Sequence, residues 1–381
     1  PDAATLARVL GMAGDEKFAR LVYDRVVEKL RREAVEDFRL DFEDGYGNRA
    51  DAEEDGHAAS SAIEVARGFA GGVLPPFIGI RIKPLSEDLR ARSVRTLDIF
   101  ISTLLGETGG KLPEKFVITV PKVQLPEQMI AAGRLFEMLE QKNGLPPGAL
   151  KIEPMIETPQ AIINERGEIA IGSLVDAAGG RCRSMHFGVY DYTASCGITA
   201  AYQAMGHPAC DFARQIMSVS LAGTGVHLSD GATNILPVGP HRATAERPLT
   251  GQQLLENRDA VHRAWQLNFS DNLHSLRTGF YQGWDLHPAQ LVTRYAAVYS
   301  FFLEGLPPAS NRLKAFVEKA ALASLFGDVF DDAATGQGLL NFFLRGIACG
   351  AITENEALET GLTLDEIRFR SFLKILESRR T

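Results

Sequence analysis

Residues that could bind a divalent cation and a small acid stand at the ends of the β-rich runs in this sequence. They are the acids Glu43, Asp44, Glu157 and Asp191 and the base Arg81. Carboxylate oxygens suit Mg2+ or Mn2+, because these ions prefer oxygen ligands and keep several positions open for water or substrate. The sequence contains no HxH or HExxH pattern that would favour zinc instead. A bound Mg2+ would act as a Lewis acid on the oxygens of a substrate.

Glu157 stands where a strand is predicted to end and a helix to begin. Ile152, Pro154 and Ile156 alternate with Glu153 and Met155, and Thr158 and Pro159 then suit the N-cap and the first position of a helix. Asp191 follows the β-rich run 184–188 in the same kind of place. Two carboxylates from neighbouring strands could share one ion, so we predict that Glu157 and Asp191 are metal ligands.

Basic residues accompany these acids on two of the runs. Arg81 could bind a substrate carboxylate through two hydrogen bonds, or stabilise negative charge on an oxygen beside the cation. It could also form an ion pair with Asp41 or Glu43, and the two roles are compatible. Lys122 follows the run 116–121. Each of these charged residues, taken singly, could instead be a helix cap or a surface charge.

Seven β-rich runs, starting about 30 to 40 residues apart except before the last, predict a parallel sheet covered by helices. The runs are 37–42, 77–82, 116–121, 151–156, 184–188, 225–229 and 280–286. Amphipathic helical stretches such as 86–105 and 126–141 lie between them. With one further unit ahead of the first run, they would make a (β/α)8 TIM barrel, whose reactive groups sit at the carboxyl ends of the strands. An open, doubly wound sheet is the alternative.

Helical segments are predicted before and after this barrel. We expect a helical segment over 1–35, the catalytic barrel over 36–305 and a helical appendage over 306–381, which begins at a break at Leu306-Pro307-Pro308. Helices are predicted in the appendage at about 310–326, 337–349, 354–360 and 364–379, the last two starting with capping boxes. The appendage would cover the barrel mouth or contact a second copy, which predicts a homo-oligomer. Alternatively, its helices complete the outer ring of the barrel.

Composition excludes several classes of protein. Of the 381 residues, 45% are hydrophobic and 23% are charged, which is typical of a globular protein rather than a disordered chain. No apolar stretch approaches the roughly 20 residues needed to cross a bilayer, and a net charge of −8 argues against nucleic acid as the partner. The four cysteines form no CxxC pair. We therefore expect a cytoplasmic protein with small-molecule partners.

Six motifs, in the same order along the chain, resemble the HpcH/HpaI aldolase family, to which the citrate lyase beta-subunit and malyl-CoA lyase belong. They are DFEDGYG, IGIRIKP, VPKVQLPEQM, IEPMIETPQAI, HFGVYDYTASCGI and GFYQGWDLHPAQL, and together they span roughly residues 36–300. The sequence departs from the family pattern at Tyr190, where a glutamate is usual, and at the RIKP ending. The segment between Asp230 and Phe280 is also longer than expected, so the chain resembles a divergent branch.

The resemblance implies a (β/α)8 barrel that makes or breaks carbon–carbon bonds with Mg2+. By position in the motifs, Glu157 and Asp191 match the metal ligands and Arg81 matches the arginine that contacts substrate oxygens. Glu43 and Asp44 match the paired catalytic acids near the metal. Lys122 matches a residue at the end of the run 116–121, which we expect to bind substrate.

The predicted function is therefore that of a Mg2+-dependent lyase or aldolase. Its substrate would be a 2-oxo or hydroxy acid or a 3-hydroxyacyl-CoA thioester, cleaved through a metal-stabilised enolate. Asp331 and Asp332 are candidates for the general acid, although they could equally cap the helix that follows. Two alternatives stay open: another enolate reaction on phosphoenolpyruvate or pyruvate, and a non-catalytic barrel that serves as a binding scaffold.

Overall fold

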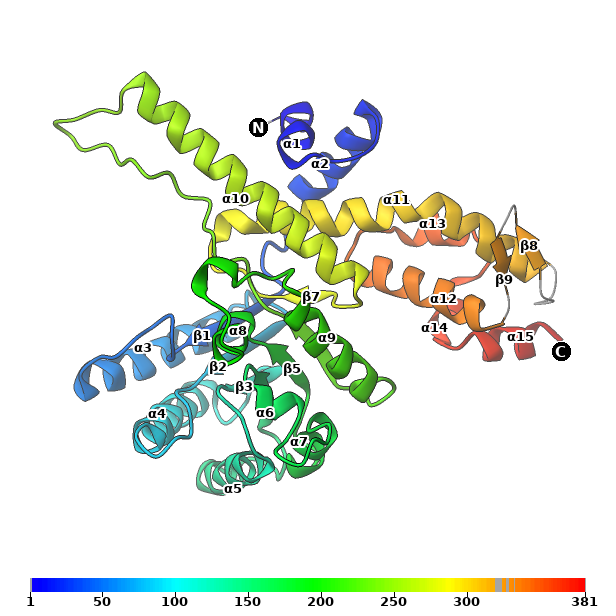
Figure 1. The fold of residues 1–381 in the computed structure, drawn as a ribbon. Helices are drawn as coiled ribbons and strands as arrows, with labels where there is room; N and C mark the ends of the chain where they lie inside the picture. Colours follow the sequence, from blue (N-terminus) through cyan, green and yellow to red (C-terminus); the bar gives the residue numbers. More distant parts are fainter. Residues whose placement is uncertain (1, 319–323, 327–328, 332, 381) are drawn as a thin grey trace. The chain divides into compact units, whose positions relative to one another are not determined.

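The computed structural model describes residues 2–318, 324–326, 329–331 and 333–380. The chain divides into two compact units, and each is described here by itself (Figure 1). The sheet unit consists of Val35–Asn234 and His274–Leu286, and the helical unit of Pro1–Ala34, Ile235–Leu273 and His287–Thr381. No helix in the described part of the chain is long and apolar enough to cross a membrane.

All seven predicted β-rich runs form strands of one parallel sheet in the sheet unit. The strands are β1 Asp37–Asp41, β2 Phe77–Arg81, β3 Phe116–Val120, β4 Lys151–Ile156, β5 Ser184–Phe187, β6 His227–Asp230 and β7 Gln282–Gly283. They are hydrogen-bonded in sequential order from β1 to β7. The predicted neighbour order is confirmed, and the alternative of an open sheet with a reversed order is wrong.

Helices connect the strands and cover one face of the sheet (Figure 1). They are α3 Asp51–Ala70, α4 Arg90–Thr108, α5 Pro126–Asn143, α6 Pro159–Ile162, α7 Ile171–Ala177, α8 Val189–Ser195, η1 Ala200–Tyr202 and α9 Pro208–Leu221. Every residue of β3 is buried, as expected for a parallel strand with side chains on one face and helices on the other. Side chains from α4 such as Phe100 and Leu104 are fully buried against this layer.

The sheet curls so that strands far apart in its order approach each other. Arg39 on β1 reaches Glu153 on β4, with Nη2 3.1 Å from Oε2. Gln282 on β7 lies 3.5 Å from Asp37 on β1, measured from Nε2 to Oδ2. The described residues contribute seven strands to this sheet, and the predicted eighth strand is not among them. The structure therefore shows a curled seven-stranded parallel sheet rather than a complete (β/α)8 barrel.

A buried ion pair lies on the concave side of this sheet. The side chain of Glu153 is 2% exposed and that of Arg39 is 8% exposed. Glu153 also accepts hydrogen bonds from Thr119 Oγ1, at 2.7 Å, and from Ser184 Oγ. Burial alone raises the pKa of Glu153, but the charge and hydrogen bonds of Arg39 outweigh it and lower this pKa to about 2. The interior of the sheet thus stabilises an ionised carboxylate.

We expect Glu153→Gln to lower the free energy of unfolding at pH 7 by about 3 kcal/mol, because Arg39 loses its buried charged partner. The folded-state pKa lies below that of the unfolded chain, so ionised Glu153 stabilises the fold above about pH 4.3. This contribution is lost as the pH falls toward about 2. Urea unfolding at pH 6 and pH 3 should therefore show a smaller pH effect for Glu153→Gln than for the parent. Glu87→Gln, at an exposed ion pair with Arg90, is the control, and equal pH effects in all three proteins would contradict the prediction.

The helical unit contains the two N-terminal helices, long central helices and the C-terminal helices. Its elements include α1 Ala3–Leu10, α2 Glu16–Arg32, most of α10 Gly251–Arg277, η2 Pro288–Gln290, α11 Leu291–Glu318, the hairpin strands β8 Ser324–Phe326 and β9 Val329–Asp331, α12 Ala333–Ala348, α13 Glu354–Leu358, α14 Leu364–Arg368 and α15 Phe372–Arg380. The predicted capping boxes of Thr353 with Glu356 and of Thr363 with Glu366 are confirmed. Asp2 and Asp15 cap α1 and α2 through their side chains.

Three predictions for the C-terminal part are wrong in detail. The break at Leu306-Pro307-Pro308 is absent, because α11 continues through both prolines. The prolines lie on its exposed side, while Leu303 and Leu313 are buried on either side of them, so burial outweighs the lost backbone hydrogen bonds. Residues 324–326 form a strand rather than the end of a helix.

The predicted helix over 364–379 is likewise interrupted, because Arg370 has a positive φ of 53° between α14 and α15. Of the two candidate general acids, Asp331 is the last residue of β9, and Asp332 lies outside the described residues.

Candidate functional site

The turn after β1 carries Glu43 and Asp44, and Asp41 determines its shape. The Oδ1 atom of Asp41 accepts a hydrogen bond from the backbone N–H of Glu43, at 3.0 Å, and Oδ2 accepts one from that of Gly45, at 2.9 Å. A Cβ atom on Gly45 would lie 2.4 Å from Oδ2 of Asp41. A residue with a Cβ atom at this position would therefore have to displace the carboxylate of Asp41.

Arg81, at the end of β2, is held by the acids of this turn. Its Nε and Nη2 atoms donate to the two carboxylate oxygens of Asp41, at 2.6 and 2.5 Å. Its Nη1 atom lies 3.1 Å from Oε2 of Glu43. The predicted ion pairs with Asp41 and Glu43 are confirmed. They fix the orientation of a guanidinium that is only 8% exposed.

Lys122 brings most of the predicted site residues together. Its Nζ atom lies 3.0 Å from Oδ2 of Asp44 and 3.5 Å from Oε1 of Glu43, and it also contacts the carboxylate of Asp191. Its backbone N–H donates to Oε1 of Glu157, at 2.6 Å. Burial by itself lowers the pKa of Lys122, but these carboxylates outweigh it and raise the pKa. Lys122 therefore stays protonated among the acids.

The backbone of Lys122 is unusual, because its φ of 54° is positive. A left-handed conformation costs energy for a residue with a Cβ atom and is often found at functional sites. Thr158 holds the same loop from the next strand, since its hydroxyl donates to the carbonyl oxygen of Val123, at 2.8 Å. Thr158 occupies the N-cap position of α6 as predicted, but its hydroxyl serves this loop rather than the helix.

Glu157, at the end of β4, is 1% exposed. Gly188, at the N-cap position of α8, leaves room for it, because a Cβ atom on Gly188 would lie 2.4 Å from Oε2 of Glu157. Burial raises the pKa of Glu157 to about 8, with Lys122 opposing this shift and Asp191 adding to it. Asp191 lies in the first turn of α8, and its side chain is 41% exposed.

The carboxyl groups of this cluster outnumber its basic groups. Around Arg81 and Lys122 lie the five acids Asp41, Glu43, Asp44, Glu157 and Asp191. When all are ionised, their five negative charges exceed the two positive charges by three. Such a surplus favours binding of a cation.

The acids fit a Mg2+ ion that keeps several waters. Among the described residues, no three His, Cys, Asp or Glu side chains form a ready-made metal cage. Mg2+ does not require one, because it usually binds one or two carboxylates together with waters and substrate oxygens. Glu157 and Asp191 supply two such carboxylates, and the ammonium group of Lys122 already shows that this cluster accommodates a positive charge.

Two aromatic residues at this site were not predicted from the sequence. The ring of Trp284, after β7, stacks on that of His186 on β5, with centroids 3.9 Å apart, and the Arg81 guanidinium lies 5.2 Å from the Trp284 ring. Burial lowers the pKa of His186 to about 3, so this ring is neutral. Side chains alternate along a strand, so Ser184 and His186 lie on the same face of β5. This alternation could have predicted the position of His186 from the sequence.

Asp230 has a structural environment, although it also ends a predicted strand. Both of its carboxylate oxygens accept hydrogen bonds from Nε of Arg214, at 2.9 Å, and Oδ2 accepts one from Ser275 Oγ, at 2.6 Å. Asp230 and Arg214 are each 1% exposed. This pair joins α9 to β6 and does not contribute to the acidic cluster.

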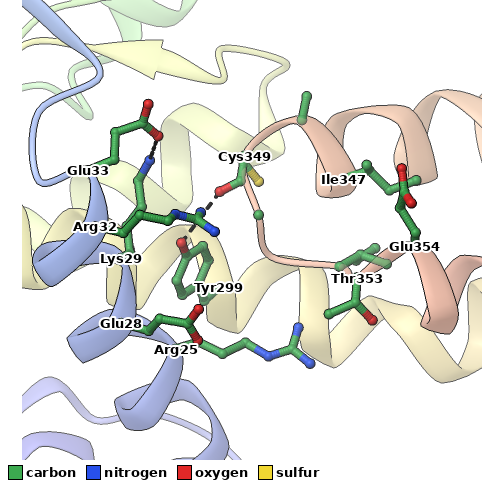
Figure 2. A pocket seen from close by; sticks show the side chains of 13 residues that line it. Arg25, Glu28, Lys29, Arg32, Glu33, Tyr299, Ile347, Cys349, Thr353 and Glu354 are labelled. Atoms are coloured by element: carbon green, nitrogen blue, oxygen red, sulfur yellow. Dashed lines mark hydrogen bonds and ion pairs between the residues drawn. The ribbon is translucent and has the colours of Figure 1, made fainter. Parts of the chain in front are cut away.

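The helical unit has a pocket of its own, with a volume of about 390 Å3 (Figure 2). It is lined by α2, α11, the end of α12 and the segment that follows. Lys29 pairs with Glu33 at 2.6 Å, and the hydroxyl of Tyr299 donates to the carbonyl oxygen of Cys349 at 3.4 Å. Three basic and three acidic side chains line the pocket, so its charge selects neither an anion nor a cation.

Solved structures of citrate lyase-like proteins and malate synthase share the fold of this chain. A citrate lyase from Burkholderia xenovorans LB400 is 18% identical, with a TM-score of 0.60, over 91% of this chain and 94% of that one. CitE from Mycobacterium tuberculosis, in complex with magnesium, acetoacetate and coenzyme A, is 15% identical, with a TM-score of 0.53, over 85% and 94%. A magnesium/glyoxylate complex of Haloferax volcanii malate synthase is 18% identical, with a TM-score of 0.51, over 94% of both chains.

These likenesses confirm, at the level of the fold, the resemblance predicted from the six motifs. No match was found among curated protein sequences. The family described as "Domain of unknown function (DUF6986)" matches residues 1–375. The match covers nearly the whole chain, and the protein belongs to this family.

Proposed function

We propose that this protein is a Mg2+-dependent carbon–carbon lyase or aldolase of the citrate lyase-like type. The observation that supports this most directly is the surplus of carboxylates around Arg81 and Lys122 at the carboxyl ends of parallel strands. In barrels of parallel strands, catalytic residues come from this edge. We further propose that the curled sheet is part of a (β/α)8-type barrel.

In this proposal Glu157 and Asp191 hold the Mg2+ ion. Glu43 and Asp44 orient the waters and substrate oxygens around it, as residues that hydrogen-bond to the ligands of a metal commonly do. When bound, the ion would polarise the oxygen of a substrate carbonyl and stabilise an enolate.

Arg81 and Lys122 supply the positive charges for the substrate. Asp41 holds Arg81 through two hydrogen bonds, so the guanidinium needs no reorientation as negative charge develops on a substrate oxygen. Lys122 would bind the carboxylate of the substrate as an ammonium ion. Its raised pKa opposes the formation of a Schiff base, which requires a neutral amine.

The proposed substrates are a small 2-oxo or hydroxy acid, or a 3-hydroxyacyl-CoA thioester. Two proteins of the same fold were solved with small oxo acids: CitE with magnesium, the 3-oxo acid acetoacetate and coenzyme A, and malate synthase with magnesium and the 2-oxo acid glyoxylate. We also propose that the protein forms a homo-oligomer through the helical part 306–381.

The test begins with calorimetric titration of Mg2+ into the chelator-treated protein. We expect saturable binding of one ion. The protein is then screened with Mg2+ for turnover of acyl-CoA thioesters and free 2-oxo acids, with product detection that separates cleavage from other enolate reactions. Absence of Mg2+ binding would contradict the metal site. Binding without turnover of any of these substrates would favour the scaffold alternative.

A further inference from the structure

An ion pair between Lys83 and Glu54 lies next to the turn after β1, which carries Glu43 and Asp44. Lys83 follows Arg81 by two residues and is 5% exposed, and Glu54, on α3, is fully buried. The Nζ atom of Lys83 lies 2.8 Å from Oε2 of Glu54 and donates to the carbonyl oxygen of Phe42, at 2.7 Å. The pair therefore connects α3 to the turn that carries Glu43.

Both partners of this pair are held by α4. Thr96 donates its hydroxyl to Oε1 of Glu54, at 2.6 Å, and Ser93 donates its hydroxyl to the carbonyl oxygen of Lys83, at 2.7 Å. The ring of Tyr46 lies 5.1 Å from Nζ of Lys83. Since each charged group has specific partners, the ion pair has little freedom to move.

The residue that Lys83 holds lies between the two acids that bind Arg81. Phe42 follows Asp41 and precedes Glu43. Its N–H donates to the carbonyl oxygen of Arg81, at 2.9 Å, and its carbonyl oxygen accepts from Lys83. Both backbone groups of Phe42 are thus fixed, and with them the direction in which Asp41 and Glu43 point.

We propose that Lys83 and Glu54 are positioning residues, which act through Phe42 to hold Asp41 and Glu43 against Arg81. This inference rests on the proposed function, because it assigns the pair a role in that site. Stability alone does not account for the pair, since well-packed apolar residues often replace a buried ion pair without loss of stability. A directed hydrogen bond to one carbonyl oxygen is what an apolar pair could not supply.

The experiment uses the double variant Lys83→Met/Glu54→Gln and a matched control at another buried ion pair. Arg181 and Glu140 lie 2.6 Å apart and are 6% and 2% exposed, and Arg181 also donates to the carbonyl oxygen of Leu150, at 3.0 Å. Arg181→Met/Glu140→Gln therefore removes the same kind of contact away from the acidic cluster. Thermal melts of both double variants measure the structural part of the effect.

Two readouts report on the site itself. The chain has two tryptophans, so Trp265→Phe leaves Trp284, beside Arg81, as the only tryptophan and a probe of the guanidinium. In this background we expect the Lys83/Glu54 variant to shift Trp284 emission toward that of Arg81→Met. We also expect its Mg2+ dissociation constant to rise about tenfold. The control Arg181→Met/Glu140→Gln should change neither the Trp284 emission nor the Mg2+ dissociation constant, even if its melting temperature falls as far as that of the Lys83/Glu54 variant.

An unchanged Trp284 emission in the Lys83/Glu54 variant would overturn the inference, because the pair would then be structural only. If the double variant does not fold, Glu54→Gln alone, which removes the charge but keeps the shape, is compared with Glu140→Gln by the same emission measurement. If the parent protein binds no Mg2+, the proposed function fails. Trp284 emission then still decides whether Lys83 and Glu54 position Arg81.

Discussion

Asp191→Asn and Glu157→Gln are each expected to raise the Mg2+ dissociation constant by more than roughly 100-fold. Loss of a residue that only hydrogen-bonds to a metal ligand can already cost that much. Each substitution removes a negatively charged oxygen ligand and keeps the shape of the side chain. Glutamine at 157 can still accept the hydrogen bond from the backbone N–H of Lys122. The measurement is calorimetric titration of Mg2+, with thermal melts of the same proteins. Turnover should be lost together with binding.

We expect both variants to fold. The side chain of Asp191 is 41% exposed, and Glu157 is a buried acid whose charge is disfavoured by its surroundings. Asp98→Asn is the matched control, because Asp98 is 36% exposed and also pairs with a lysine, Lys142 on α5. If Asp191→Asn binds Mg2+ as the parent does, the metal site lies elsewhere. If both site variants unfold, the two acids are structural and the scaffold alternative gains support.

Arg81→Lys is expected to lower kcat by about 100- to 1,000-fold, as the loss of a preorganised group that stabilises transition-state charge commonly does. Lysine keeps the positive charge but cannot reproduce the two hydrogen bonds from Nε and Nη2 to Asp41. The charge would then no longer be fixed in direction. The measurement is steady-state kinetics, with Mg2+, on the substrate that the parent protein turns over, so that kcat and KM are separated.

Arg181→Lys is the control for this prediction, because Arg181 is also buried and binds both oxygens of one carboxylate, that of Glu140. We expect it to lower thermal stability and leave kcat unchanged. Arg81→Lys with parent kcat and a raised KM would assign Arg81 to substrate binding alone. Unchanged kcat and KM would leave it as a purely structural partner of Asp41.

The strands of the sheet unit could be predicted because their signals are local. β3 is a short apolar run and β4 a mostly apolar one, and a helix starts a few residues after each. Such patterns need no knowledge of distant residues. Reliance on local patterns also explains why the break predicted at Pro307 and Pro308 was wrong. A proline pair normally ends a helix, but burial of the apolar face on either side, including Leu303 and Leu313, continues α11 through it.

Local sequence patterns were enough to predict the parallel strand–helix order and the charged residues at the strand ends. Both follow from patterns a few residues long. The pairing of those residues could not be predicted in the same way, because their partners are distant in the chain. Lys122 contacts Asp44 and Asp191, which are 78 and 69 residues away. The curl of the sheet likewise brings Trp284 to Arg81. Burial and neighbouring charge, which set the raised pKa of Glu157, exist only once the strand ends converge.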